Sequence, residues 1–327
     1  MNYFYGYIGT ILLCAVLCLP GCKQPETERV AGAMPDHFSV YYTCDTRGHI
    51  EPCGCSEGMA GGIARRMSLL TSKAGGTSLL VDAGDVTAGA RDWERFEASY
   101  ILEGYQAMGY DAVNAGHREA QLTAEQLRAW EAKYGFFVST NLMDAEGNPV
   151  LPPYRIVDFP NHYRVGILGV MESTLEAAEL GEGLHIAEPV DAIAKYLPEL
   201  KAQVDTIVLL AFTDEEEMKS LATRFFELDV IVGGNVIQPI PSPLKVNRSV
   251  LVSITAKGKA VGQLTLTRDA SGVMTPSSEV HMLLEDVADA SEGTAIVDAF
   301  KKELANMDFQ PHRDDEEGLT TITSARS

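Results

Sequence analysis

The chain has 327 residues and a formal net charge of −20 at pH 7. Residues 1–21 contain no Asp, Glu, Lys or Arg, so the whole of this charge lies on the rest of the chain. A surface this acidic repels nucleic acid and anionic lipid, and neither is expected as a partner.

The first segment is predicted to direct export and lipid attachment. Residues 8–19 form an apolar run without charge. A membrane-spanning helix needs about 20 residues, so this run is too short to be one. The run ends in Leu19-Pro20-Gly21-Cys22, which resembles the lipobox of bacterial lipoproteins. The resemblance implies a signal peptide of residues 1–21, acylation of Cys22, and a lipid anchor in the membrane at the periplasmic or extracellular face of the cell envelope. Residues 22–37, which include the acylated cysteine, are predicted to be a flexible tether because Pro and Gly interrupt them without periodicity.

Residues 38–307 alternate short apolar runs with stretches of helical length, which predicts a single α/β domain. Continuous apolar runs are typical of strands covered on both faces. The predicted strands are Phe38–Thr43, Ser78–Asp82, Ala112–Ala115, Phe136–Ser139, Arg164–Val170, Thr206–Leu210 and Val230–Val232. The predicted helices are Ile63–Ser72, Trp93–Met108, Ala124–Tyr134, Pro189–Gln203 and Glu215–Phe226.

The pattern changes after Gly233-Gly234. Residues 249–255 and 263–267 alternate apolar and polar side chains, and are predicted to be antiparallel strands in the second half of a sandwich. Residues 308–327 are polar and charged, which predicts a disordered tail.

Two carboxylates follow predicted strands. Asp45 comes after the strand of residues 38–43, and Asp85 after the strand of residues 78–82. Ligand sites in open α/β sheets lie beyond the carboxyl ends of the strands, so both side chains could converge on one site. Loop aspartates are also ordinary turn residues, and either one alone is weak evidence.

Read together, the motifs over residues 38–268 resemble the metallophosphoesterase domain of the bacterial periplasmic 5′-nucleotidase family. In chain order they are Asp45-Thr46-x-Gly48, Gly61-Gly62-Ile63-Ala64-Arg65-Arg66, Leu80-Val81-Asp82-Ala83-Gly84-Asp85, Gly109-Tyr110-Asp111-Ala112-Val113, Gly116-His117-Arg118-Glu119, Ser139-Thr140-Asn141-Leu142, Val165-Gly166-Ile167-Leu168-Gly169-Val170 and Asp229-Val230-Ile231-Val232-Gly233-Gly234. The resemblance implies a four-layer α/β/β/α sandwich of the metallo-dependent phosphatase type, with a two-metal site at its rim. Only 60 residues follow Thr267, so we expect the family's C-terminal nucleotide-binding domain to be missing.

The metal-binding pattern of that family is incomplete here. Asp45 and Asp85 match its aspartates, and His117 stands where the family has an asparagine ligand. Side chains of other chemistry occupy the remaining positions, namely Arg47, Arg118, Phe212, Asn235 and Ile237. Since a two-metal hydrolase needs ions about 3.5–4 Å apart that clamp the reacting oxygens, we expect at most one divalent ion, zinc or manganese. Its predicted ligands are Asp45, Asp85 and His117.

Two functions remain open. The favoured one is a 5′-nucleotidase-like fold that has lost standard two-metal hydrolysis and serves binding or thiol chemistry. The alternative is an active one-metal phosphoesterase in which Asp45, His117 and Arg118 are catalytic. The candidate substrate-binding residues are Arg47, Asn141 and Asn235, and the two arginines could form a small anion-binding pocket.

Cysteines are the feature that the resemblance does not explain. Cys44 directly precedes the first aspartate, and Cys53 and Cys55 lie on the loop that follows. These three thiols could join His49 and His117 in a zinc-type site, where Cys53 and Cys55 would be ligands. They could instead form a redox dithiol with Cys44 as resolving partner, or a structural disulfide from Cys44 to either of the others. Each interpretation requires the sulfur atoms to lie close together.

Overall fold

The computed structural model describes residue 1 and residues 31–53, 59–75, 77–176, 179–236, 238–254, 257–269 and 274–307. Residues 2–21 of the predicted signal peptide, the acylation site Cys22, Cys55, Ile237 and the predicted tail lie outside the described residues. The chain divides at Ala31, and the fold below is that of the unit which begins there. Among the described residues, no helix combines the length and the apolar character needed to cross a membrane.

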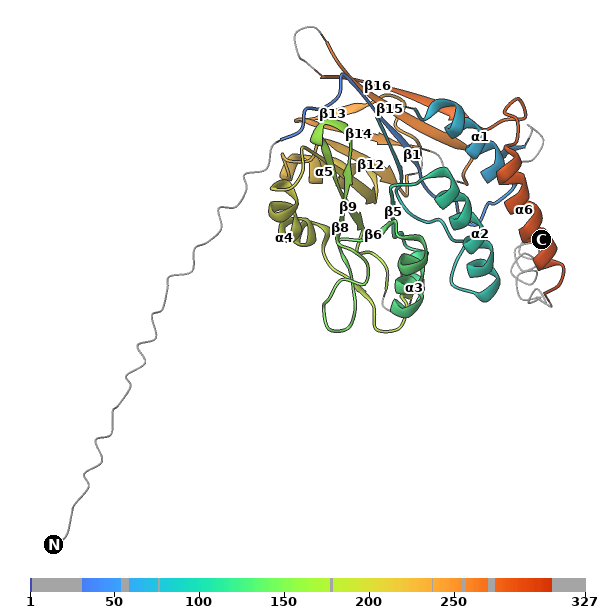
Figure 1. The fold of residues 1–327 in the computed structure, drawn as a ribbon, viewed down its shortest axis with the longest axis horizontal. Helices are drawn as coiled ribbons and strands as arrows, with labels where there is room; N and C mark the ends of the chain where they lie inside the picture. The colour runs from blue at the N-terminus through green and yellow to red at the C-terminus, as the bar shows by residue number, and fades with distance from the viewer. Residues whose placement is uncertain are drawn as a thin grey trace, which may run out of the picture. The chain divides into compact units, whose positions relative to one another are not determined.

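Two six-stranded mixed sheets form the centre of the described fold (Figure 1). The first sheet has the order β16 (Met274–Met282), β15 (Ala260–Arg268), β1 (His37–Thr43), β4 (Ser78–Asp82), β5 (Ala112–Asn114) and β6 (Phe137–Val138). The second has the order β13 (Leu244–Val246), β14 (Ser249–Ser253), β12 (Val230–Gly234), β11 (Thr206–Phe212), β9 (Arg164–Met171) and β8 (Tyr154–Asp158). In each sheet four consecutive strands run parallel, and the antiparallel strands lie outside them.

Helices cover the outer face of each sheet (Figure 1). The first sheet is covered by α1 (Ile63–Lys73), α2 (Asp92–Met108), α3 (Ala124–Tyr134) and α6 (Ser291–Leu304), and the second by α4 (Pro189–Lys201) and α5 (Glu215–Arg224). Short elements complete the description: β2 (Pro52–Cys53) with β3 (Ala60–Gly61), β7 (Leu142–Met143) with β10 (His185–Ile186), and the 3₁₀ turns Glu119–Gln121 and Pro160–His162.

Apolar side chains on alternate faces of the strands explain the layering. In β1, Phe38 and Val40 belong to the core between the two sheets, whereas Tyr41 belongs to the core beneath the helices. In β11, Val208 faces the other sheet and Leu209 packs with the residues of α4 and α5. Both faces of these strands are therefore buried, which is why their sequences are continuously apolar. The predicted four-layer α/β/β/α sandwich is confirmed.

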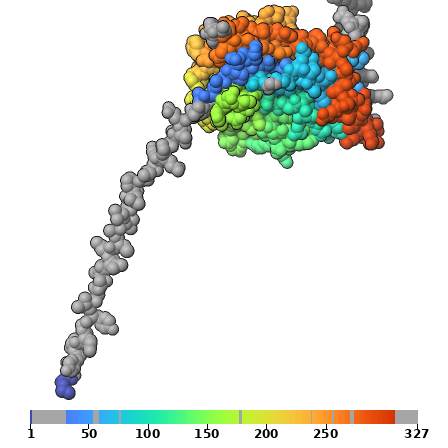
Figure 2. Space-filling model, turned by 45° about the horizontal axis from the view of Figure 1, so that its top comes forward, coloured from blue at the N-terminus to red at the C-terminus, as the bar shows by residue number. Residues whose placement is uncertain are grey.

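The predicted placement of the last strands was wrong in part. Residues 263–267 lie in β15, which pairs antiparallel with β1 in the first sheet instead of extending the second. Figure 2 shows orange residues from late in the chain beside blue residues from early in the described fold, in line with the pairing of β15 with β1. Residues 249–253 form β14, which pairs parallel with β12 and antiparallel only with β13. Alternation identifies a strand and its buried face, but the partner strand depends on contacts distant in the chain.

A buried arginine links the helices to the loops that carry the site. Arg66 on α1 is fully buried, and its Nη1 donates to the Tyr105 hydroxyl at 2.6 Å. Its Nη2 donates to Thr46 Oγ1 at 3.1 Å, in the loop after β1. The Tyr105 hydroxyl donates in turn to Asp82 Oδ2 at 2.8 Å, and Asp82 Oδ1 accepts the backbone N–H of Gly84. Arg66 is the second arginine of the Gly-Gly-Ile-Ala-Arg-Arg segment. Its buried positive charge is compensated by this network inside the fold.

Candidate functional site

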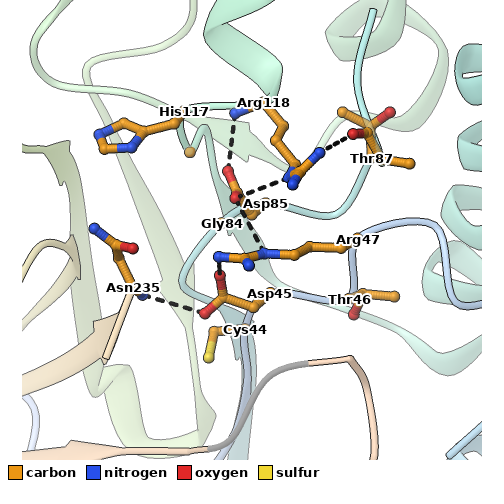
Figure 3. A network of polar contacts seen from close by, with 12 residues as sticks. Cys44, Asp45, Thr46, Arg47, Gly84, Asp85, Thr87, His117, Arg118 and Asn235 are labelled. Atoms are coloured by element: carbon orange, nitrogen blue, oxygen red, sulfur yellow. Dashed lines mark hydrogen bonds and ion pairs between the residues drawn. The ribbon is translucent and has the colours of Figure 1, made fainter. Parts of the chain in front are cut away.

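Polar side chains from both sheets meet beyond the carboxyl ends of the parallel strands (Figure 3). Asp45 follows β1, Asp85 follows β4, and His117 with Arg118 follows β5. Asn235 comes directly after β12 of the second sheet. The predicted convergence of the two aspartates at one edge of the fold is confirmed, since Arg47 contacts both of them.

The backbone at this edge adopts the left-handed conformation at four residues that are not glycine. Their φ angles are 49° at Asp45, 49° at Arg47, 58° at Asp85 and 56° at Asn235. Asp and Asn tolerate this region better than Arg does, and such residues cost about 1–3 kcal/mol each. The loops after β1 and β4 are held together by backbone bonds from Asp45 N to Gly84 O at 2.8 Å and from Arg47 N to Asp85 O at 2.9 Å. Strained backbone is thus concentrated where the polar side chains converge.

Arg47 lies between the two aspartates (Figure 3). Its Nη2 donates to Asp45 Oδ1 at 2.6 Å, and its Nε lies 3.5 Å from Asp85 Oδ2. The second contact is an ion pair without hydrogen-bond geometry, because Nε has no hydrogen-bond partner. Asp45 and Asp85 are only 2% and 3% exposed. One guanidinium group therefore compensates two buried carboxylates.

Arg118 adds a second positive charge at Asp85. Its Nε lies 3.4 Å from Asp85 Oδ2, and its backbone N–H donates to Asp85 Oδ1 at 2.9 Å. Its Nη1 also donates to the carbonyl of Ala88. Asp85 is consequently in contact with the guanidinium groups of both arginines that stand at positions of the family's metal-binding pattern.

Glu119 fixes the loop geometry from beneath. Its fully buried carboxylate accepts the backbone N–H groups of Asp85, Thr87 and Gly116, each at 2.9 Å. The loops after β4 and β5 are therefore tied to a single side chain. Glu119 belongs to a motif identified in the sequence but was assigned no role there, and its position as last residue of Gly116-His117-Arg118-Glu119 was the available signal.

Glu172, which no motif identified, contacts Asn235 and His117 at the same edge of the fold. It follows β9, and its Oε1 accepts from Asn235 Nδ2 at 2.8 Å. Asn235 also donates its backbone N–H to Asp45 Oδ2 at 3.2 Å. His117 Nε2 lies 3.9 Å from Glu172 Oε1 and has no hydrogen-bond partner. The His117 ring packs edge-on against Phe212, with ring centroids 5.0 Å apart.

Burial governs the titration of these groups. Desolvation lowers the pKa of His117, which favours the neutral imidazole, although Glu172 opposes the shift. Desolvation, together with the charge of Glu119, raises the pKa of Asp85, while Arg47 and the Arg118 N–H oppose the rise. Desolvation also raises the pKa of Glu119.

The residues present do not fit a two-metal centre. A guanidinium group can donate hydrogen bonds but offers no lone pair to a metal ion, and Arg47 lies in contact with both aspartates that would hold one. Within the described ranges, no three His, Cys, Asp or Glu side chains gather as a metal-binding group. The single-ion ligand set predicted from the sequence is also not assembled, because His117 Nε2 is directed at Glu172 and Arg47 separates Asp45 from Asp85.

The two described cysteines, Cys44 and Cys53, differ in their burial. Cys44 is buried between the sheets, where its Sγ donates to the carbonyl of Ile254 at 3.4 Å. Burial raises the pKa of the Cys44 thiol well above its usual value, so the reactive thiolate is disfavoured. Cys53 lies half-buried on β2, and both are free thiols in this structure, so it does not show a disulfide between these two; a disulfide from Cys44 was one of the open alternatives. Roles for Cys53 with Cys55 stay a prediction, since Cys55 lies outside the described residues.

Two other candidates have local roles in this structure. The His49 Nδ1 lies 3.0 Å from the Thr46 carbonyl and 2.9 Å from the Arg47 carbonyl, so it caps its own loop. Asn141 is fully buried and donates to the carbonyls of Met171 and Ala187. Its Oδ1 also accepts the Met171 N–H at 3.1 Å. Its amide contacts backbone instead of the charged side chains, and its substrate-binding role stays a prediction.

Because the Glu119 carboxylate accepts three backbone hydrogen bonds, we expect its replacement by an amide to destabilise the fold. In a Glu119→Gln variant, one oxygen becomes an NH₂ group that faces a backbone donor. We expect the free energy of unfolding to fall by about 1–3 kcal/mol, the cost of leaving a buried donor unsatisfied. Urea denaturation of both proteins measures this loss. The exposed Glu125 on α3 supplies the control, Glu125→Gln, for which we expect a change within about 0.5 kcal/mol. Equal stabilities of the two variants would contradict the role of Glu119.

Comparison with known proteins agrees with this architecture. No model of a protein family matches the chain. The 5′-nucleotidase of Vibrio cholerae is 24% identical over 259 residues, which cover 71% of this chain and 46% of that protein. The 5′-nucleotidase of Diplobatis ommata is 26% identical over 308 residues, covering 84% and 53%. The chain thus spans about half the length of the curated relatives it matches.

A solved structure shows the same fold. The 5′-nucleotidase precursor of Thermus thermophilus superposes with a TM-score of 0.70 at 25% identity, over 84% of this chain and 60% of that one. Its match supports the predicted metallophosphatase-type α/β fold with two mixed sheets. The chain is accordingly similar, at low sequence identity, to 5′-nucleotidases, and it has the metallophosphatase-type fold of the solved structure.

Proposed function

We propose that this protein binds a small anion at the site where its family would hold metal ions, and does not carry out standard two-metal phosphoester hydrolysis. The observation that carries the proposal is the position of Arg47, whose guanidinium contacts both Asp45 and Asp85. Arg118 reinforces it with a further contact to Asp85.

Electrostatics supports the exclusion of a divalent ion from between the aspartates. Arginine stays protonated at any physiological pH, so Arg47 keeps its positive charge. A divalent cation about 4 Å from that charge would be repelled by about 8 kcal/mol at an effective dielectric constant of about 20. The two carboxylates would have to offset this repulsion while losing their present partner. A metal ion could enter only if Arg47 moved away.

Parts of both arginines remain accessible to a ligand. The side chains of Arg47 and Arg118 are 32% and 36% exposed. The planar guanidinium group presents several N–H donors in a fork that matches the oxygens of phosphate, sulfate or carboxylate. Because both groups contact Asp85, they are held near each other with their remaining donors available. This arrangement favours an oxyanion over a cation on this side of the site.

Substituting Arg47 tests the proposal directly. We expect the wild-type protein to bind Mn²⁺ weakly by calorimetry and to hydrolyse an aryl phosphate and nucleoside monophosphates no faster than background. In an Arg47→His variant, the positive charge is removed and an imidazole ligand is supplied, so Mn²⁺ affinity should rise at least about tenfold. The matched control is Arg47→Lys, which keeps the charge and should leave Mn²⁺ affinity unchanged.

The competing function, a one-metal phosphoesterase, has a distinct outcome in the same assay. Wild-type turnover above about 1 s⁻¹ with Mn²⁺, Zn²⁺ or Co²⁺, lost in Asp85→Ala, would contradict the proposal. Thermal melts of each variant confirm that the protein under assay is folded.

We also propose that the protein is a lipoprotein held at the cell envelope through Cys22. The support is the short apolar run of residues 8–19 followed by Leu19-Pro20-Gly21-Cys22. Metabolic labelling with a palmitate analogue should mark the wild-type protein and not Cys22→Ala, because the thiol is the expected acylation point. Cys44→Ala serves as the control and should be labelled like wild type, since that thiol is buried in the fold. Equal labelling of wild type and Cys22→Ala would contradict the anchor.

A further inference from the structure

The site has two chemically different sides. Arg47 and Arg118 form what we call the arginine side, and Glu172 with His117 and Asn235 forms the glutamate side. Figure 3 shows His117 and Asn235 on the side of the two aspartates away from the Arg118 guanidinium. Asp45 joins the sides, since its Oδ1 accepts from Arg47 and its Oδ2 from the backbone of Asn235. A ligand at this edge therefore meets both sides.

Charge balance shows that an anion alone is a poor complement to the whole site. Two guanidinium groups stand against four carboxylates, which are those of Asp45, Asp85, Glu119 and Glu172. A ligand with a positive group on the glutamate side would offset this excess.

The glutamate side also contains groups without a full set of partners. His117 Nε2 is a buried nitrogen with no hydrogen-bond partner, 3.9 Å from Glu172 Oε1. Unsatisfied buried polar atoms are uncommon in folded proteins and call for an explanation. The Glu172 side chain is 22% exposed and fixed by Asn235, so its carboxylate is both oriented and reachable. A donor group placed at Glu172 would complete this side.

We propose that the site binds a small soluble ligand that carries both an oxyanion and an ammonium group. The oxyanion is held by the arginine side and the ammonium group by Glu172, which acts as the specificity-determining residue. This inference rests on the proposed anion-binding function and adds the second recognition element to it. The two functional groups of the ligand correspond to the two sides of the site.

A pair of compounds that differ in one group tests the inference at pH 7. 2-Aminoethyl phosphate carries the ammonium group, and ethyl phosphate has the same phosphate without it. We expect the wild-type protein to bind 2-aminoethyl phosphate at least about tenfold more tightly by calorimetry, equivalent to about 1.4 kcal/mol. In Glu172→Gln this preference should fall below about threefold, while ethyl phosphate binds as well as before or better. Glu125→Gln is the matched control and should keep the preference, because that side chain is exposed on α3.

Other outcomes separate this inference from the proposed function. Equal wild-type affinities for the two compounds would overturn the inference and leave anion binding intact. Failure of both compounds to bind would overturn both proposals. Binding of Mn²⁺ that is lost in Glu172→Gln would assign the glutamate side to a metal ion and overturn the inference. Binding to phosphatidylethanolamine vesicles without binding to the free compound would contradict a small soluble ligand.

Discussion

The arrangement of the site depends on two carboxylates that are buried at the edge of the fold and need a positive charge. Asp45 and Asp85 are almost completely removed from water, and an unpaired buried carboxylate costs several kcal/mol. In a metallophosphoesterase, such a pair would be compensated by metal ions. Here Arg47 provides the charge from within the chain, two residues after Asp45. We propose that the same scaffold thereby supports a different kind of recognition.

The fold fixes this geometry through hydrogen bonds between the loops that follow neighbouring parallel strands. Strands β1 and β4 run parallel in register, so the loops that follow them leave the sheet side by side. Glu119 ties the β4 and β5 loops from inside the protein, and Arg66 ties the β1 loop to α1 and α2. These contacts over-determine the backbone, which allows Arg47 to keep an unfavourable left-handed conformation. The strain is located at the residue that places a positive charge between the two aspartates.

Much of the fold could be predicted because local pattern and burial agree. Continuous apolar runs such as residues 206–210 are long enough to identify strands covered on both faces, and the helix predicted for residues 124–134 matches α3. The convergence of Asp45 and Asp85 followed from the rule for carboxyl ends of parallel strands. The pairing of β15 with β1 could not be predicted, since a strand's alternation does not name its partner. Glu172 was missed for a related reason, because its site partners lie 55 or more residues away in sequence. The burial of Cys44 between the sheets could not be predicted either, because it depends on which face of β1 packs against the second sheet.

Arg47 is proposed to occupy the place of a metal ion, and diffraction from crystals soaked in Mn²⁺ tests this proposal most directly. Anomalous difference maps locate manganese independently of any activity. We predict no anomalous peak between Asp45 and Asp85, and density for the Arg47 guanidinium in contact with both carboxylates. An anomalous peak between the two aspartates, with Arg47 turned away toward solvent, would contradict the account.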